Sequence, residues 1–368
     1  MKIERITARE ISMRLKAPFE TSFGVTQDRR IVLIELETED SIGWGELTAP
    51  EGPYYNSETT DTAWIVIREF LVPLLIGRSF DNPSGMVAAM EPVRGHEMAK
   101  ASLECAAWDA LARAQNIPLS KLLGGTLTQL PSGVSLGIHA DTGALIERIA
   151  KELTAGYRRV KLKIKPGKDV AVVEAVRKAY PEIDLTVDAN SAYRLEDSPL
   201  LKQLEEFNLT YIEQPLAWNE IYEHAQLQRE LKTPICLDEC IHSLRDAVAA
   251  IQLGACGVIN IKLGRVSGHT EARKIQTYCA EHSIPVWCGG MLESGIGRAH
   301  NIAMSTLSGF VFPGDVSASA RYWHQDIIEP EVTVTADGTI VPPDGPGIGF
   351  KVRTEMIEEI TARKEHWS

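Results

Sequence analysis

Charged side chains recur at a nearly constant interval in the middle of this chain. Lys163, Asp188, Glu213 and Asp238 are separated by 25 residues each, and Lys262 follows after another 24. Each of the five closes a short apolar stretch typical of a buried strand, in residues 160–163, 185–188, 210–213, 235–238 and 258–262. Because this interval accommodates one strand and one helix, the pattern predicts a repeated β/α unit whose charges meet at one edge.

The three acidic residues predict a metal site. Asp188, Glu213 and Asp238 offer only oxygen ligands, which favours Mg²⁺, with Mn²⁺ as a substitute, over Zn²⁺. A single carboxylate after a strand is more often the N-cap of the next helix. Three carboxylates in phase with lysines make that alternative the weaker one, so we expect all three to bind the metal.

The lysines of this pattern are candidate acids and bases. Lys161 and Lys163 are two residues apart on one strand and therefore point to the same side. A lysine crowded by a second ammonium group and a divalent cation holds its proton less firmly, so Lys163 can act as a base. No histidine occupies a strand end opposite it. We therefore expect Lys262 to face Lys163 across the metal and to provide the base on the other side.

The elements that must position these residues form an α/β barrel. Residues 134–138, 284–288 and 309–312 predict the first, seventh and eighth strands around the five already named, with helices between them. The 25-residue interval is absent outside the middle of the chain. We therefore predict a modified TIM barrel, (β/α)₇β, over residues 125–321, and an α+β capping domain built from residues 1–124 and the tail, 322–368. Within the cap, residues 59–75 and an alanine-rich segment, 98–115, predict helices.

The residues at the strand ends resemble motifs of the enolase superfamily, and the resemblance extends over nearly the whole chain. Five motifs are similar to the muconate-cycloisomerase subgroup of this superfamily: KLK (161–163), DAN (188–190), EQP (213–215), DE (238–239) and NIK (260–262). Two further motifs, KLGR (262–265) and GGMLESGIGRAHN (289–301), are similar to the o-succinylbenzoate synthase and N-acylamino acid racemase branch of that subgroup.

The resemblance implies where substrate is bound. It makes residues 17–24, with Phe19 and Phe23, a lid over the substrate, whereas the residues alone favour a loop packed on its own sheet. The turn carrying Tyr54 and Tyr55 is interpreted in the same way. The glycines at 289–290 would let the backbone approach the substrate, and a phosphate-binding role for them is disfavoured because no lysine or arginine follows before residue 298. The expected substrate contacts are Phe19, Phe23, Tyr54, Tyr55, Ser135, Gly290, Met291 and Glu293.

Three further polar residues have supporting roles with alternatives. Asn190 is either a helix cap or a residue that orients a metal ligand. Glu239 follows Asp238 and is expected to point the other way, as a hydrogen-bond partner rather than a fourth ligand. Arg265 is either one half of a surface ion pair or a buried cation that tunes Lys262.

Composition restricts the partners. The net charge of −12 argues against nucleic acid or a membrane surface, and no stretch approaches membrane-spanning length. The six cysteines lack CxxC spacing and suggest reduced core residues of a cytoplasmic protein. The resemblance implies a small carboxylate substrate and a homo-oligomer.

The resemblance implies proton abstraction next to a carboxylate, through an enediolate intermediate. The first interpretation is o-succinylbenzoate synthase, the dehydration step of menaquinone biosynthesis, with N-acylamino acid racemase activity in addition or instead. A muconate-type cycloisomerase or dipeptide epimerase is the alternative enzyme. A barrel that binds metal or ligand without turnover is disfavoured, because all five catalytic positions are present.

Overall fold

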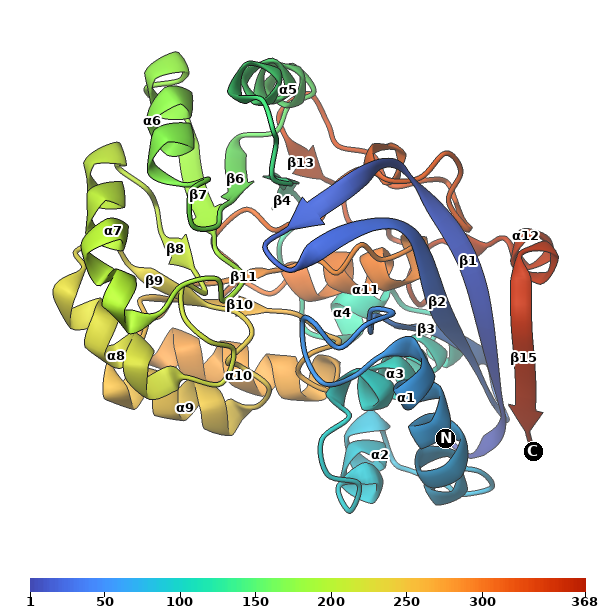
Figure 1. Cartoon of the computed structure of the whole chain (residues 1–368). Helices are drawn as coiled ribbons and strands as arrows, with labels where there is room; N and C mark the ends of the chain where they lie inside the picture. Colours follow the sequence, from blue (N-terminus) through green and yellow to red (C-terminus); the bar gives the residue numbers. More distant parts are fainter.

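The computed structural model describes all residues, 1–368, and contains two main β-sheets. The first is antiparallel, in the spatial order β15 (Thr361–Trp367), β1 (Ile3–Thr21), β2 (Gly24–Thr38) and β3 (Ile42–Leu47). The second is parallel, with its strands in chain order: β5 (Gly133–Leu136), β6 (Arg159–Lys163), β7 (Asp184–Asp188), β8 (Ile212–Glu213), β9 (Ile235–Leu237), β10 (Val258–Ile261) and β11 (Val286–Cys288). Figure 1 shows the two sheets side by side. The predicted barrel with an α+β cap is confirmed.

Helices α1 (Thr60–Val66), α2 (Pro83–Met90) and α3 (Glu97–Ala114) belong to the cap, and π-helical and 3₁₀ turns over 67–74 extend α1. The alanine-rich segment forms α3, which packs directly against β3. A Cβ atom on Gly43 would lie 2.0 Å from the carbonyl oxygen of Ala106, and one on Gly45 would lie 2.0 Å from that of Ser102. Glycines in the strand and small side chains in the helix therefore permit this close approach.

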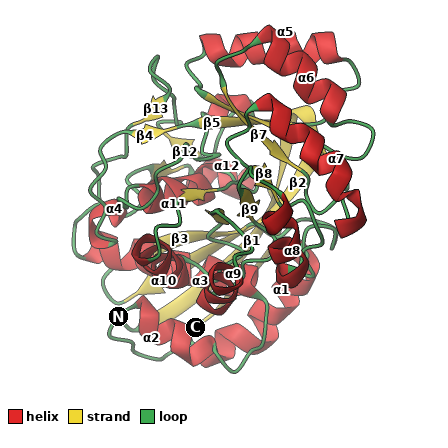
Figure 2. Cartoon of the chain, turned by 90° about the vertical axis from the view of Figure 1, so that its left-hand side faces the viewer, coloured by secondary structure: helices red, strands yellow, loops and turns green.

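The barrel helices follow the strands in order and cover their outer side, as Figure 2 shows for α5 to α8. Several begin at a side chain that accepts hydrogen bonds from the first turn: Asp141 caps α5, Ser243 caps α9 and Ser294 caps α11. The short helix α4 (Leu119–Leu122) precedes the first barrel strand. The helices that follow barrel strands are α5 (Thr142–Thr154), α6 (Val170–Ala179), α7 (Ser198–Gln203), α8 (Ile221–Glu230), α9 (Leu244–Leu253), α10 (His269–Glu281) and α11 (Gly295–Ser305).

The predicted eighth strand, 309–312, is not a regular strand. Phe310 makes a single parallel bridge to Val286 of β11, and Gly314 makes another to Ser132 next to β5. The backbone N–H of Val311 also donates to the carbonyl of Val286, and the carbonyl of Gly314 accepts from the N–H of Gly133. The segment thus connects the last strand to the first, but its contacts with the two neighbours come from different residues, so no continuous ladder forms.

The tail contributes to both halves of the molecule. Strand β15 pairs with β1 from Ile6↔Trp367 to Ile11↔Thr361, so it forms one edge of the cap sheet. Before it, β13 (Thr339–Ile340) pairs with β4 (Leu130–Pro131), and β12 (Ile328–Glu329) pairs with β14 (Lys351–Val352), which α12 (Thr354–Glu359) follows. Trp323 belongs to the large core cluster with barrel residues. The exact domain boundaries, at 124/125 and 321/322, stay a prediction.

All six cysteines are free and buried. The helices are too short or too polar for any of them to span a lipid bilayer.

Candidate active site

The five strand-end charges converge because consecutive parallel strands are paired in register. Lys163 of β6 is paired with Asp188 of β7, and Asp188 with Glu213 of β8. Asp238 directly follows β9, and Lys262 directly follows β10. The side chains of Asp188, Glu213 and Asp238 are completely buried at this mouth.

Lys161 lies beneath the mouth, among three carboxylates. Its Nζ is 2.7 Å from Asp315 Oδ2, 2.8 Å from Glu213 Oε2 and 3.2 Å from Asp188 Oδ2. Burial opposes the charged form, but these carboxylates outweigh burial and raise the pKa of Lys161 well above its ordinary value. The same geometry, with the ammonium of Lys163 as a further neighbour, holds the pKa of Asp188 below its ordinary value in spite of burial.

The two candidate bases contact different carboxylates. Lys163 Nζ donates to Asp188 Oδ2 at 2.5 Å and to Asn190 Oδ1 at 2.7 Å. Lys262 Nζ donates to Asp238 Oδ2 at 2.7 Å and to the Tyr55 hydroxyl at 3.2 Å. Because their strands lie on different sides of the carboxylate group, the ammonium groups approach it from two directions.

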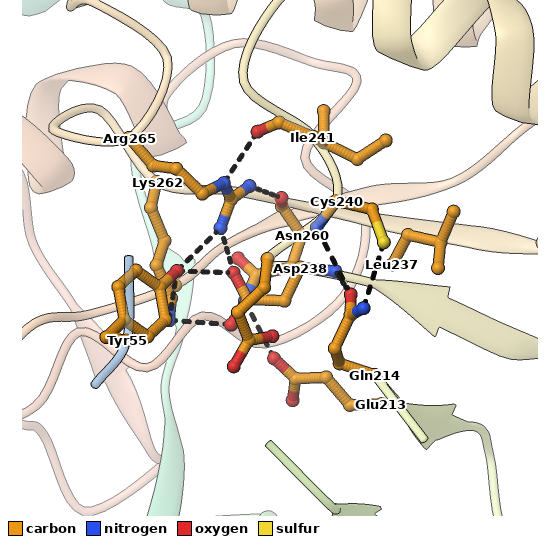
Figure 3. A network of polar contacts seen from close by, with 12 residues as sticks. Tyr55, Glu213, Gln214, Leu237, Asp238, Cys240, Ile241, Asn260, Lys262 and Arg265 are labelled. Carbon is orange, nitrogen blue, oxygen red and sulfur yellow. Dashed lines mark hydrogen bonds and ion pairs between the residues drawn. The ribbon is translucent and has the colours of Figure 1, made fainter. Parts of the chain in front are cut away.

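Arg265 is fully buried, so the surface ion pair considered for it is wrong. Its Nη1 contacts Asp238 Oδ1 and lies 3.1 Å from the Tyr55 hydroxyl, which itself donates to Asp238 Oδ1 at 2.9 Å. Its other nitrogens donate to the carbonyl oxygens of Ile241 and Asn260. Figure 3 shows the guanidinium between these groups, next to Lys262. Asp238 is therefore compensated by two cations.

Asn190 and Glu239 support the Lys163 side. The Asn190 side chain caps no helix; besides accepting from Lys163, its Nδ2 donates to Glu239 Oε1 at 3.0 Å. Glu239 does act as a hydrogen-bond partner, but its buried side chain reaches Asn190 on the Lys163 side of the site and does not point away from it. Burial, followed by the nearby negative charge of Asp188, raises the pKa of Glu239 to about 7.

The segment 17–24 is the tip of the β1–β2 hairpin and not a separate loop. Thr21 is paired with Gly24, and the tip reaches the barrel: Ile138 donates its N–H to the Glu20 carbonyl at 3.0 Å, and Ser22 Oγ donates to the Asn190 carbonyl at 3.0 Å. These contacts with barrel loops exclude a loop packed only on its own sheet. The cap thus covers the mouth from above.

Two small cavities separate the hairpin tip from the barrel, and both are lined by Phe19, Lys163, Lys262 and Gly290. The inner one also contacts Ser135 and Glu293, and the outer one contacts Phe23, Tyr55 and Met291. Tyr54 is an exception among the expected contacts. Its side chain is 72% exposed and lines neither cavity, so the structure separates it from the site.

Glu293 stabilises the loop after β11 through hydrogen bonds. Its Oε1 accepts from the backbone N–H of Met291 at 2.8 Å and from Asn301 Nδ2 at 2.9 Å. Gly289 shows why this loop needs glycine, because a Cβ there would lie 2.4 Å from Asn260 Oδ1 and 2.7 Å from Lys262 Cε. The loop can approach the lysine only without a side chain.

Two residues of the site were given no role in the sequence analysis, although Asn260 belongs to the NIK motif quoted there. Asp315 joins Lys161 to the buried Arg159, whose Nη2 is 2.9 Å from Asp315 Oδ1. Asn260 donates from Nδ2 to Glu213 Oε1 at 2.8 Å. A signal existed for Asp315, since it is one more carboxylate after an apolar stretch. For Asn260 the alternation of side chains along β10 places it on the same side as Lys262.

The donor set fits a hard divalent cation. Asp188, Glu213 and Asp238 present only carboxylate oxygens, and two buried oxygens beside them, Glu239 Oε2 and Asn260 Oδ1, have no hydrogen-bond partner. Buried oxygens without a donor are costly unless a cation or water satisfies them. These residues therefore could hold such an ion.

Comparisons with known proteins agree with this geometry. Residues 3–124 match the mandelate racemase/muconate lactonizing enzyme N-terminal domain, and residues 144–356 match the enolase C-terminal domain-like family. The chain is 49% identical to o-succinylbenzoate synthase of Geobacillus kaustophilus, covering 98% of this chain and 96% of the relative. It is 45% identical to N-succinylamino acid racemase of Thermus thermophilus over the full length of both.

A crystal structure of an enolase superfamily member from Listeria innocua superimposes with a TM-score of 0.96, at 42% identity, covering 100% of this chain and 99% of that one. Both domains of the chain thus match the same family, and the matches leave almost no part of either chain uncovered. The chain belongs to the mandelate racemase/muconate lactonizing enzyme family of the enolase superfamily, a superfamily of enzymes that use a divalent metal ion.

Proposed function

We propose that this enzyme is an o-succinylbenzoate synthase that dehydrates 2-succinyl-6-hydroxy-2,4-cyclohexadiene-1-carboxylate to 2-succinylbenzoate in menaquinone biosynthesis, and that it also racemises N-succinylamino acids. Some relatives are named o-succinylbenzoate synthase and others N-succinylamino acid racemase, and they are 42–49% identical to this chain over nearly their full length. The observation that carries the proposal is the pair of lysines, Lys163 and Lys262, hydrogen-bonded to carboxylates on different strands of one barrel mouth.

The metal proposed for the site is Mg²⁺, with Mn²⁺ as a substitute, held by Asp188, Glu213 and Asp238. A bound divalent cation would bind the substrate carboxylate and offset the second negative charge that develops there when the α-proton leaves. An oxygen-only set of buried carboxylates supports Mg²⁺ over Zn²⁺. Lys161, held among three carboxylates, keeps its positive charge and adds a fixed cation beside the substrate carboxylate.

Lys163 is the proposed base for dehydration. It removes the α-proton, and the same ammonium then protonates the leaving hydroxyl if both groups depart from one face. Lys262 would act in this reaction only as a positive charge next to the reacting carboxylate. Two partners other than the substrate, Asp238 and Tyr55, hold its Nζ in place.

Racemisation uses the two lysines differently. The antipodes of an N-succinylamino acid present their α-protons to opposite faces, so each lysine is the base for one antipode and the acid for the other. A substrate with a leaving group on the next carbon loses it, and a substrate without one is reprotonated. The same set of residues therefore supports both reactions, and the substrate determines the outcome.

The direct test is to assay both reactions on one preparation. We expect Mg²⁺-dependent loss of the cyclohexadiene absorbance with the dehydration substrate, and Mg²⁺-dependent loss of optical rotation with N-succinyl-L-amino acids. A preparation that performs neither reaction, and exchanges no α-proton in D₂O, would overturn the proposal. Turnover of the racemisation substrate alone would restrict it to the second activity.

We also propose a cytoplasmic location, which the six free, buried cysteines support. The homo-oligomer expected from the resemblance stays a prediction, which sedimentation of the purified enzyme tests.

A further inference from the structure

Gln214 is a fully buried residue directly after the metal-ligand candidate Glu213. Its backbone has a φ of 37°, a left-handed conformation that is uncommon for residues other than glycine. Strained backbone at such a position persists only where surrounding contacts hold it. Those contacts connect three strand ends, because the Gln214 N–H donates to the carbonyl of Cys236 in β9 and its carbonyl accepts from Ser191 after β7.

The Gln214 side chain extends this connection to the other side of the site. Its Oε1 accepts from the backbone N–H of Asp238 at 3.0 Å and of Cys240 at 3.4 Å. Its Nε2 lies within hydrogen-bond distance of the carbonyls of Leu216 and Ala217, at 3.2 and 3.3 Å, and of Cys240 Sγ, at 3.0 Å. Figure 3 shows the Gln214 amide beside Leu237 and Cys240 at the end of β9. Both ends of the amide are thus occupied.

The side chain is needed because the strand ladder ends too early. The pairing of β8 with β9 stops at Glu213↔Cys236, so Asp238 lies two residues beyond the last pair. Its N–H is bonded to Gln214 Oε1, and this is the contact that ties the Asp238 backbone to the strand carrying Glu213. Asp238 would otherwise be positioned relative to Glu213 only through its side chain and its own flanking residues.

We propose that Gln214 is a positioning residue that sets the affinity of the site for its divalent cation, by fixing the Asp238 backbone relative to Glu213. The proposal rests on the metal site proposed above and adds a residue that touches neither the metal nor the substrate. Removal of partners that orient metal ligands in this way typically weakens metal affinity by about 10 to 100-fold. Glutamate cannot replace this residue, because a carboxylate lacks the Nε2 donor and would add a buried negative charge next to Glu213.

The chain contains a matched control in Gln228 of α8. Its Oε1 accepts from the backbone N–H of Ile235 at 2.7 Å, and its Nε2 donates to the carbonyls of Leu231 and Thr233, both at 3.3 Å. Gln228 therefore binds the same strand, β9, with the same groups, but at the end remote from the carboxylates. The substitution of either glutamine by methionine removes the amide and keeps the side-chain length.

The experiment compares Gln214→Met, Gln228→Met and the unmodified full-length enzyme. Dissociation constants for Mn²⁺ are measured by electron paramagnetic resonance and for Mg²⁺ by calorimetry, with thermal unfolding as the measure of stability. We expect both variants to lose stability, Gln214→Met to bind Mn²⁺ about 10 to 100-fold more weakly, and Gln228→Met to bind it within about twofold of the unmodified enzyme. Activity of Gln214→Met should recover as the Mg²⁺ concentration is raised.

A second variant, Gln214→Asn, keeps the amide but shortens the side chain by one methylene, so it tests the reach to Asp238 if the methionine variant does not fold. A folded Gln214 variant with unchanged Mn²⁺ affinity would overturn the inference, as would equal weakening in Gln228→Met. Failure of the unmodified enzyme to bind Mn²⁺ would overturn the proposed metal site as well. These outcomes are therefore distinguishable.

Discussion

Replacing Lys163 or Lys262 by alanine separates the two activities proposed for the site. Lys163→Ala should abolish both dehydration and racemisation. Lys262→Ala should abolish racemisation, yet the antipode whose α-proton faces Lys163 should still exchange that proton without inversion. The two variants are expected to differ because the two Nζ atoms lie at different positions: Lys163 is hydrogen-bonded to Asp188, and Lys262 is hydrogen-bonded to Asp238.

The size of the loss follows from what remains after each substitution. Asp238 keeps Arg265 and the Tyr55 hydroxyl when Lys262 is removed, and Asp188 keeps Lys161, whose Nζ is 3.2 Å away. Neither carboxylate is left without a partner, so we expect metal binding to persist. The loss is then that of a general base, about 10² to 10⁴ in rate, which corresponds to about 3 to 5 kcal/mol in the activation barrier.

Proton NMR in D₂O measures α-proton exchange for each antipode of an N-succinylamino acid, and absorbance measures dehydration. Lys168→Ala is the control, because this lysine follows the same strand but bonds only the carbonyl of Ala140 near the surface. Near wild-type dehydration by Lys163→Ala would refute the assignment. So would exchange of the same antipode at similar rates by both alanine variants.

Three further predictions concern the metal, the pH dependence and the cap. Asp188→Asn, Glu213→Gln and Asp238→Asn should each weaken Mn²⁺ binding and remove catalysis; full activity in any of them, or activity that survives exhaustive chelation, would count against that ligand set. Burial lowers the pKa of His224 to about 4, below its unfolded value of about 6.5, so the stability that neutral His224 contributes is present above pH 6.5 and is lost as pH falls toward 4. The loss amounts to about 3 kcal/mol, and urea unfolding at pH 4.5 and 7 should show a smaller difference for His224→Gln than for the unmodified enzyme; an equal difference would contradict this. Gly45→Ala should destabilise the fold by about 1 to 3 kcal/mol, because its Cβ would overlap the Ser102 carbonyl, whereas an unchanged melting temperature would show that α3 can shift.

The sequence predicted the barrel and the convergence of its charges with few elements misplaced. Parallel strands expose their carboxyl ends at one edge, so a charge repeated at every strand end is brought to that edge by the architecture alone. The predicted strands of the parallel sheet agree with the observed ones within a few residues, although several are shorter in the structure. The strand predicted at 309–312 was wrong because an apolar run does not determine its partners. Here only Phe310 of the run makes a bridge to β11, and the bridge to Ser132 comes from Gly314, so no continuous ladder forms.

The remaining features depended on contacts between residues distant in the chain. Tyr54 and Tyr55 are adjacent and alike, and only the packing of the cap against the barrel decides that Tyr55 bonds Asp238 while Tyr54 faces solvent. The burial of Arg265 likewise depends on that packing, since its partners include Tyr55 of the cap. Residue types and spacing determine which groups a regular fold brings to one edge, whereas the direction of a side chain in a turn, and its burial beneath another domain, are determined only by tertiary structure.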